Sequence, residues 1–524
     1  MRPGCCPCTS IASKTERDRN GERFPACCLP AFVSDGIAGL PHRLVDSEAD
    51  PGRRPDPAFP GILFMSDSQL PSRNDVPPLQ EQFGTMVIGA TAGLIAVAFH
   101  AVMNLAEETR AELAVLATDQ GLLAQAGVVI ICGLLAAAAV FLVHRYAPEA
   151  EGSGIAAVLE AHRAVSGRRA FRILWVKFLA GFCGLSSGMP LGREGPSVQI
   201  GAMSALILRQ YGPKLVYYRR RAVELGAAAG LAAAFNAPLA GVVFSFELLR
   251  QPFHAHNCFE TILACAIADW VCRLFHGPVL ELPMILDGFR AWHELPIFAL
   301  VGLWAGSIAL VFQWFLLAVA KQFQAFADRP TAIVTFTGSW GCLLGLILLW
   351  QPAVLGIGHP LFEASIENTM PLALAAAALA ARIPLTAVSY ATGAPGGLIV
   401  PALLFGVLGG QIFSQGYGLL MGGVEADFHA VCLVAGMAAS IGALFRTPLT
   451  ATIMAVEITG TYTCLLEISI AYIAAHSLLG LARQPDLYTA LGRIHQSHVG
   501  GKTARLAAAR PSGGPSLRPP DASD

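Results

Sequence analysis

Long stretches of apolar residues, separated by short polar segments and by segments rich in glycine and proline, fill most of the chain between residues 83 and 482. Several stretches are long enough to cross the ~30 Å hydrocarbon core of a bilayer as a helix, whereas others are too short. Short, broken helices at membrane depth occur where they line a protein cavity, and they mark transporter binding sites. The pattern therefore predicts an all-α integral membrane protein with discontinuous helices. The apolar runs are Phe83–Leu105, Ala126–Val143, Leu295–Ala320, Ala332–Trp350, Pro371–Ala381, Ala402–Gly410 and Leu465–Ala482.

Composition agrees with this interpretation. Hydrophobic residues make up 54% of the 524 residues and charged residues 14%, against about 25% charged in average soluble domains. The 35 Lys and Arg residues balance the 36 Asp and Glu residues, so no domain-wide basic surface is available and nucleic acid is not expected as a partner. We expect a multi-pass protein of a bacterial inner membrane, in contact with lipid over most of its length.

The two ends of the chain differ from this apolar middle. Residues 1–82 are mostly polar and contain no apolar run suited to a signal sequence, so we expect a largely disordered leader in which Met65 is an alternative start of translation. Five of the 13 cysteines lie in this leader, at a spacing that fits no ordinary zinc pattern, and no metal site is predicted. Residues 497–524 are expected to form a disordered tail.

An internal repeat organises the apolar middle. The string Ala229–Ala233 leads to Pro238 and then to Glu247, and the string Ala435–Ala439 leads in the same way to Pro448 and Glu457. Nine positions separate the proline from the glutamate in both copies, although the distance from the glycine to the proline differs by four residues. Weak duplications of this kind build inverted-repeat transporters that bind their substrate between the two halves. A chance likeness between two alanine-rich helices is the alternative.

The string Gly192–Pro196 is the strongest chemical signal. Proline suits the first turn of a helix, and a glycine beside it lets an ion approach the free backbone donors closely. A helix N-terminus carries about half a positive charge, so it can hold an anion or, in its place, the carboxylate of Glu194. Because acids inside a membrane are costly and usually functional, the string predicts an anion site with a carboxylate gate. A helix cap with an incidental acid is the alternative.

Three strings together make the chain resemble the CLC family of voltage-gated chloride channels and proton/chloride antiporters. They are Gly152–Ile155 preceded by Pro148–Ala150, Gly192–Pro196, and Gly396–Pro401. The resemblance covers roughly residues 84–496. It implies a homodimer in which each subunit has its own pore, built from tilted helices in two inverted halves, about 83–280 and 290–496. The residues after the membrane domain are too few for the paired nucleotide-sensing CBS domains of some relatives.

The resemblance also implies roles for individual residues. Ser153 is similar to the central chloride ligand, Tyr488 is similar to the second hydroxyl donor, and Glu194 is similar to the external gate. Without the resemblance, a helix cap and an interfacial aromatic are the simpler interpretations of the two hydroxyl residues. A serine at the central position favours chloride over nitrate. The implied chloride-binding set is completed by Gly154 and Ile155 and by the backbone N–H groups of Glu194, Gly195, Leu398 and Ile399.

Three positions depart from the family pattern. Ala156 and Ile399 replace a common proline and phenylalanine, which changes the shape of the pore. Leu248 stands where antiporters commonly carry an internal proton-accepting glutamate, and the neighbouring Glu247 points about 100° away on a helix of ~3.6 residues per turn. We therefore expect passive or weakly proton-coupled chloride conduction, with tightly coupled proton/chloride antiport as the alternative.

Other interpretations stay open at this point. Secondary transport of another small anion would use the same helix-end chemistry. The string Gly184–Gly188 matches the Gly-x-Ser-x-Gly pattern of hydrolases around Ser186, but it lies in an expected membrane helix, so no enzyme activity and no cofactor are predicted. Lys177 lies in an apolar run and either adds positive potential near the pore or pairs with a buried acid.

Overall fold

The computed structural model describes residues 78–161, 165–211, 219–277, 280–284, 292–324 and 329–494. These residues all lie in one compact unit. The expectations for the leader up to residue 77, with Met65 and its five cysteines, and for the tail 497–524 concern residues outside the described ranges.

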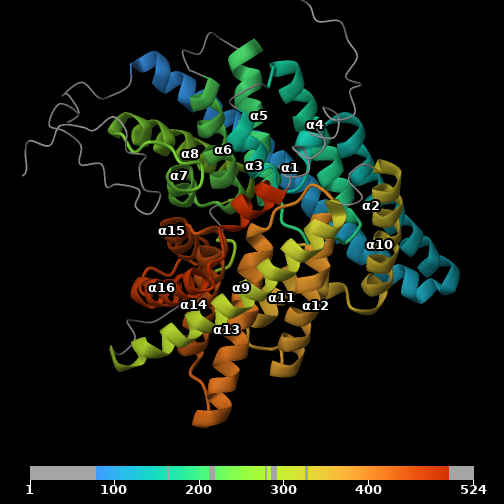
Figure 1. Ribbon diagram of the computed structural model, residues 1–524, viewed down its shortest axis with the longest axis vertical. Coiled ribbons are helices and arrows are strands. Elements are labelled where there is room, and N and C mark those ends of the chain that lie inside the picture. The colour runs from blue at the N-terminus through green and yellow to red at the C-terminus, as the bar shows by residue number, and fades with distance from the viewer. Residues whose placement is uncertain are drawn as a thin grey trace, which may run out of the picture. The chain divides into compact units, whose positions relative to one another are not determined.

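The described part of the chain is helical, with a single isolated β-bridge between Gly192 and Gly397 (Figure 1). The α-helices are α1 Leu79–Gln120, α2 Leu122–Tyr146, α3 Ile155–Ala161, α4 Gly167–Ser186, α5 Glu194–Tyr211, α6 Arg219–Phe235, α7 Pro238–Glu247, α8 Ala255–His276, α9 Leu295–Gln324, α10 Pro330–Trp350, α11 His359–Ile366, α12 Leu372–Ala391, α13 Ile399–Met421, α14 Ala426–Phe445, α15 Pro448–Thr459 and α16 Leu465–Leu481. Short 3₁₀ turns are η2 Pro148–Ala150, η3 Trp292–Glu294 and η4 Pro352–Val354.

Seven helices of this part are long and apolar enough to cross a membrane, namely α1, α2, α9 with η3, α10, α12, α13 and α14. Shorter apolar helices, α7, α15 and α16, accompany them. The mixture of long and short apolar segments was predicted, and two of the shorter apolar runs are parts of longer helices. The run Pro371–Ala381 continues as a helix to Ala391, and the run Ala402–Gly410 is the middle of α13. The apolar run stops at Arg382, which lies buried inside α12 and donates to two carbonyl oxygens that offset the cost of burying its charge.

The same pairs of helices pack together twice along the chain. Helix α5 packs on α6, α6 on α7 and α8, and α1 on α8; eight helices later, α13 packs on α14, α14 on α15 and α16, and α9 on α16. Glycines bring the backbones together in both copies. A Cβ atom at Gly201 would collide with the carbonyl oxygen of Gly226, and one at Gly406 would collide with that of Gly436. Small residues at helix interfaces are the usual means of close packing in membranes.

Helices α7 and α15 join the two copies to one another, and they are labelled one above the other in Figure 1. The carboxylate of Glu247, at the end of α7, accepts hydrogen bonds from the N–H groups of Leu449 and Thr450 at the start of α15, at 2.9 and 2.8 Å. The carboxylate of Glu457 in α15 accepts from the N–H groups that start α7, at 3.0 and 2.7 Å. Each helix end therefore caps the beginning of the other, and the two helices run antiparallel, as two inverted copies require.

Candidate functional site

Three loops that precede helices meet at one point between the two copies. Gly192, before α5, and Gly397, before α13, exchange two backbone hydrogen bonds, with N···O distances of 2.9 and 2.6 Å. The N–H group of Gly396 donates to the carbonyl oxygen of Gly152 at 3.0 Å, which ties in the loop before α3. The three strings that were singled out in the sequence are therefore adjacent in space.

Gly195 shows why this meeting point is rich in glycine. A Cβ atom there would lie 2.9 Å from the Cα atom of Gly397 and 3.0 Å from the Cα atom of Ser153. Real Cβ atoms do not come so close to backbone atoms, so any larger residue would push the three loops apart. The glycine was predicted to allow the approach of an ion, and the structure adds a packing reason for it.

The N-termini of α5 and α13 both lie in this region. The hydrogen-bond ladder of α5 begins with Ser197 N–H donating to Arg193 O, and that of α13 begins with Ala402 N–H donating to Leu398 O. The N–H groups of Glu194 and Gly195, and those of Leu398 and Ile399, precede these bonds and have no place in the ladders. Two helix ends, each with about half a positive charge, thus converge.

Two hydroxyl groups lie at the same place. The Ser153 Oγ atom accepts a hydrogen bond from Ile155 N–H at 3.3 Å, so its own O–H remains free to donate. Tyr488 is buried, its ring stacks on Phe445 with a centroid distance of 5.0 Å, and its hydroxyl faces Ser153. Within the described residues this tyrosine hydroxyl has no hydrogen-bond partner. A buried hydroxyl without a partner costs ~1–3 kcal/mol unless a ligand accepts its proton.

Tyr390 of α12 is a third hydroxyl at this place that the sequence did not reveal. Its Oη atom accepts a hydrogen bond from Ser153 N–H at 3.5 Å, and a Cβ atom at Gly152 would lie 2.9 Å from it. A single tyrosine in an apolar run carries no signal of its own. Only its position six residues before Gly396 links it to one of the recognised strings.

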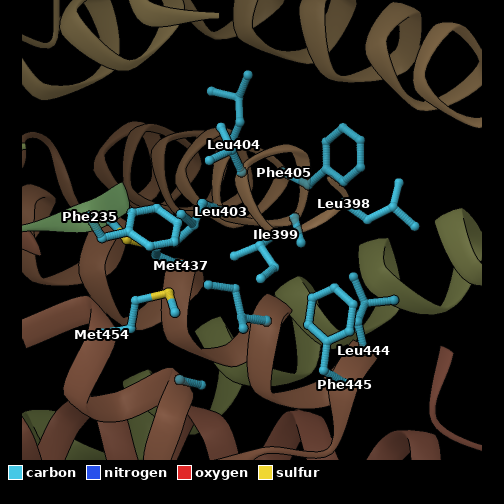
Figure 2. Packing of buried hydrophobic residues seen from close by; sticks show 14 of the residues in the cluster. Phe235, Leu398, Ile399, Leu403, Leu404, Phe405, Met437, Leu444, Phe445 and Met454 are labelled. Carbon is cyan, nitrogen blue, oxygen red and sulfur yellow. The ribbon is translucent and has the colours of Figure 1, made fainter. Parts of the chain in front are cut away.

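The walls around the helix ends are apolar. Leu398 and Ile399 start α13 within the large buried cluster, which also includes Phe235 and Phe445. In Figure 2, which draws part of this cluster, Ile399 lies near the centre of the view, with Phe235 on one side of it and Phe445 on the other. An apolar surrounding strengthens the electrostatic effect of the few polar groups that face it.

Glu194 is the acid of the site and is 2% exposed. Its Oε1 atom lies 3.8 Å from Arg193 Nε, and its buried Oε2 atom has no hydrogen-bond partner among the described residues. Arg193 is itself shared, because it lies 3.6 Å from Glu281 Oε2 and donates to Asn104. A cavity of about 30 Å³ borders Glu194, and Arg193, Glu281 and His359 also line it.

A larger cavity, of about 630 Å³, reaches Tyr488 and is also lined by Leu248, Arg446 and Asp486. Leu248 caps the C-terminus of α7 on the wall of this cavity. Glu247 also borders the cavity, but its carboxylate is held by the N–H groups of α15 and by the hydroxyl of Thr450, at 2.7 Å. Leu248 and the bound carboxylate of Glu247 therefore lie side by side at the end of α7, on the wall of this cavity.

Lys177 is fully buried in α4 behind the Ser153 loop. Its Nζ atom donates to the carbonyl oxygens of Ala150 and Gly152 at 2.9 and 2.6 Å. Within the described residues it has no carboxylate at ion-pair distance, so a buried partner acid is not the reason for its position. Gln199 of α5 supports the same loop through Glu149 O at 2.6 Å.

The Gly-x-Ser-x-Gly string does not form a strand–turn–helix junction. Ser186 is the last residue of α4, and its buried hydroxyl has no hydrogen-bond partner, histidine or other, in the ranges that the structure covers. The geometry required of a serine nucleophile is absent from these residues.

Comparisons with known proteins agree with the three strings. A family model described as "Voltage gated chloride channel" matches residues 132–480. The "H(+)/Cl(-) exchange transporter ClcA" of Salmonella typhi is 32% identical over 427 residues, which cover 80% of this chain and 89% of that protein. The transporter of the same name from Salmonella paratyphi A is 31% identical over 425 residues, with the same shares covered.

Solved structures share the fold. The crystal structure of a slow cyanobacterial Cl⁻/H⁺ antiporter has a TM-score of 0.74 and 24% identity, and the match covers 81% of this chain and 99% of that one. A eukaryotic CLC transporter has a TM-score of 0.65 and 22% identity, over 80% of this chain and 74% of that one.

Proposed function

The chain belongs to the voltage-gated chloride channel family, the CLC family, and we propose that it transports chloride across the bilayer in exchange for protons. Relatives over 80% of the chain are named proton/chloride exchange transporters, which favours this alternative over the passive conduction expected from the sequence. The observation that carries the proposal is the buried carboxylate of Glu194 at the N-terminus of α5, whose first N–H groups precede the hydrogen-bond ladder of that helix.

In this proposal chloride occupies the meeting point of the three loops. Donors are the hydroxyls of Ser153 and Tyr488 and the N–H groups at the starts of α5 and α13. Gly154 and Ile155 hold Ser153 in place, since Ile155 N–H binds the serine oxygen. Helix dipoles and hydroxyls hold an anion without a lysine or arginine in direct contact, and such moderate binding allows the ion to leave.

Glu194 gates the site by competing with chloride. When ionised, its carboxylate occupies the anion position nearest the start of α5; when protonated, it loses its charge and yields this position to chloride. Each protonation of Glu194 therefore brings one proton onto the transport pathway, and chloride then enters the position that the carboxylate has left. The large cavity at Tyr488 and the small cavity at Glu194 are the two approaches to the site.

Protons reach Glu194 from the side of Tyr488 through water in the large cavity, because Leu248 cannot carry a proton. Glu247 is occupied with the N–H groups of α15 and is a poor substitute. We therefore propose exchange with slower proton transfer than a glutamate at position 248 would give. We further propose a homodimer in a bacterial inner membrane, each subunit with its own pore.

Purified protein in liposomes tests the exchange. With a high internal chloride concentration, and with potassium and valinomycin to remove the voltage, chloride efflux should drive proton uptake and raise the external pH. Glu194→Ala should keep the chloride flux but lose both proton uptake and the dependence of flux on pH. Glu108→Gln, at an exposed acid of α1, is the matched control and should behave like the wild type.

Two results would contradict the proposal. If the wild type releases chloride without proton movement, the protein conducts chloride passively and the proposed exchange is wrong. pH-dependent flux in Glu194→Ala would remove the gating role from this residue. Competition of unlabelled anions with radioactive chloride uptake decides whether another small anion is the preferred substrate.

A further inference from the structure

A second cluster of charged side chains lies where the N-terminal turns of α1 and α8 pack together. It consists of Glu81 from α1 and His256 and Glu260 from α8. The His256 Nε2 atom is 3.5 Å from Glu81 Oε2 and 3.5 Å from Glu260 Oε1. All three atoms, each able to bind a metal ion, lie within 4.8 Å of one another.

The state of Glu260 indicates that this cluster accommodates a ligand. The residue is 1% exposed, and its Oε2 atom accepts a hydrogen bond from Arg221 Nε at 2.7 Å. Its Oε1 atom is buried, has no hydrogen-bond partner among the described residues, and faces His256. An unsatisfied oxygen of a buried carboxylate is costly, and a cation at this point would remove the cost.

The distances fit a metal ion better than a hydrogen bond from a protonated histidine. A charge-assisted N–H···O bond from a protonated histidine would have an N···O distance of ~2.7–2.9 Å, shorter than either contact of His256. Ligand atoms arranged as a tetrahedron around Zn²⁺, at ~2.0–2.1 Å from the metal, lie ~3.3 Å from each other. The two separations from His256, 3.5 Å each, are close to this second value, and the two carboxylate oxygens lie within 4.8 Å of each other.

Arg221 prepares the cluster for a ligand. It donates to Glu260, to Gln251 Oε1, to the carbonyl oxygen of Asn257 and to the hydroxyl of Thr261, so it fixes the beginning of α8. Hydrogen bonds that orient a ligating carboxylate in this way are typical of metal sites. Arg221 binds Glu260 Oε2, the oxygen that does not face His256. Glu224 forms ion pairs with both Arg220 and Arg221, and its negative charge partly neutralises theirs.

We propose that Glu81, His256 and Glu260 form a binding site for a divalent transition-metal ion, with Zn²⁺ the best match, which joins the N-terminal turns of α1 and α8. One imidazole nitrogen and two carboxylate oxygens are a ligand set that suits Zn²⁺, and water completes the coordination. The side chains of His256 and Glu81 are 41% and 22% exposed, so the ion has access from solvent.

The test uses the full chain in detergent, after removal of any affinity tag and of bound metal with a chelator. After dialysis against Zn²⁺, the wild type should retain one more zinc ion per chain than His256→Ala. Zn²⁺ should also raise the melting temperature of the wild type, and this rise should be lost in His256→Ala and in Glu81→Gln. We expect each variant to bind Zn²⁺ at least about 100-fold more weakly at this site.

Two variants serve as controls. His254→Ala removes an exposed histidine from the same helix end, and Cys258→Ser removes a thiol from the first turn of α8; both should retain the zinc of the wild type. Co²⁺ gives an independent signature. The difference spectrum between wild type and His256→Ala should show the d–d bands of a bound ion without the charge-transfer band of a thiolate ligand.

Three outcomes would overturn the proposal. Equal zinc content and equal melting shifts in wild type and His256→Ala would show that the cluster does not bind the metal. Loss of zinc in Cys258→Ser, with retention in His256→Ala, would assign the ion to the thiol. A melting temperature that depends on pH through His256, without a zinc difference between the variants, would show a proton in place of the metal.

Discussion

Tyr488→Phe separates an anion ligand from a structural aromatic residue. The Tyr488 hydroxyl is buried without a hydrogen-bond partner in the described part of the chain, while the ring keeps its stacking on Phe445 in either residue. A hydrogen bond to a charged group contributes ~1.5–3 kcal/mol. If this hydroxyl donates to chloride, its removal should weaken chloride binding about 10- to 150-fold.

The same substitution should have the opposite effect in a buffer without chloride. There the variant no longer buries an unsatisfied hydroxyl, so its free energy of unfolding should rise by ~1–3 kcal/mol. Titration calorimetry with sodium chloride into protein in isethionate buffer measures the first effect, and thermal melting in the two buffers measures the second. Tyr417→Phe, on α13 with its ring stacked on Phe428, is the control and should change neither.

Unchanged chloride affinity in Tyr488→Phe, or a lower melting temperature in isethionate, would refute this reasoning. The first result would mean that the hydroxyl does not touch the anion. The second would mean that the hydroxyl is satisfied by water or by a neighbour and supports the fold.

Three further predictions concern the supports of the site. Glu247→Gln disturbs three hydrogen bonds and should lower the free energy of unfolding by about 2–4 kcal/mol. Glu457→Gln disturbs two and should lower the free energy of unfolding less. Melting curves in detergent measure both changes, and a larger loss of stability in Glu457→Gln would contradict the prediction. Leu248→Glu should increase the protons moved per chloride in the liposome assay, and an unchanged ratio would remove this position from the proton path. Lys177→Met should weaken chloride binding by more than about tenfold, because two carbonyl oxygens of the Ser153 loop lose their buried hydrogen-bond donor. Titration calorimetry measures this affinity, and a value equal to that of the wild type would contradict the prediction.

The sequence predicted those parts of the molecule that depend on unusual local chemistry. An acid between glycines in an apolar setting is costly, so the string around Glu194 is conspicuous from its residue types alone. The internal repeat can also be recognised from the sequence, because Glu247 and Glu457 follow Pro238 and Pro448 at the same spacing of nine positions. The structure gives that spacing a physical meaning: each glutamate reaches the N–H groups beside the proline of the other copy.

The parts that were missed depend on partners far away in the sequence. Arg382 ended the expected run of apolar residues, yet it is buried in α12 because it donates to the carbonyl oxygens of Gly356 and Ile357. Tyr390 joins the site only because α12 carries it to Ser153. Neither residue has a local pattern that distinguishes it from an ordinary membrane residue. The proposed proton path is equally hard to predict from the sequence. Leu248 shows that a proton-accepting glutamate is missing at this position, but the sequence does not indicate which group carries the proton instead.

In the proposed mechanism, the buried side chains of Lys177 and Arg193 favour an anion without binding it directly. Lys177 is directed at two carbonyl oxygens, and Arg193 is divided between Asn104, Glu194 and Glu281. Their charges therefore raise the potential around the site without a direct contact to the anion at Ser153. A lysine in direct contact would bind chloride more tightly in this apolar surrounding and would slow its release. In the proposed site, helix ends and hydroxyls share the charge of the ion among several weak donors, and we propose that Glu194 displaces the ion by competing for the same donors.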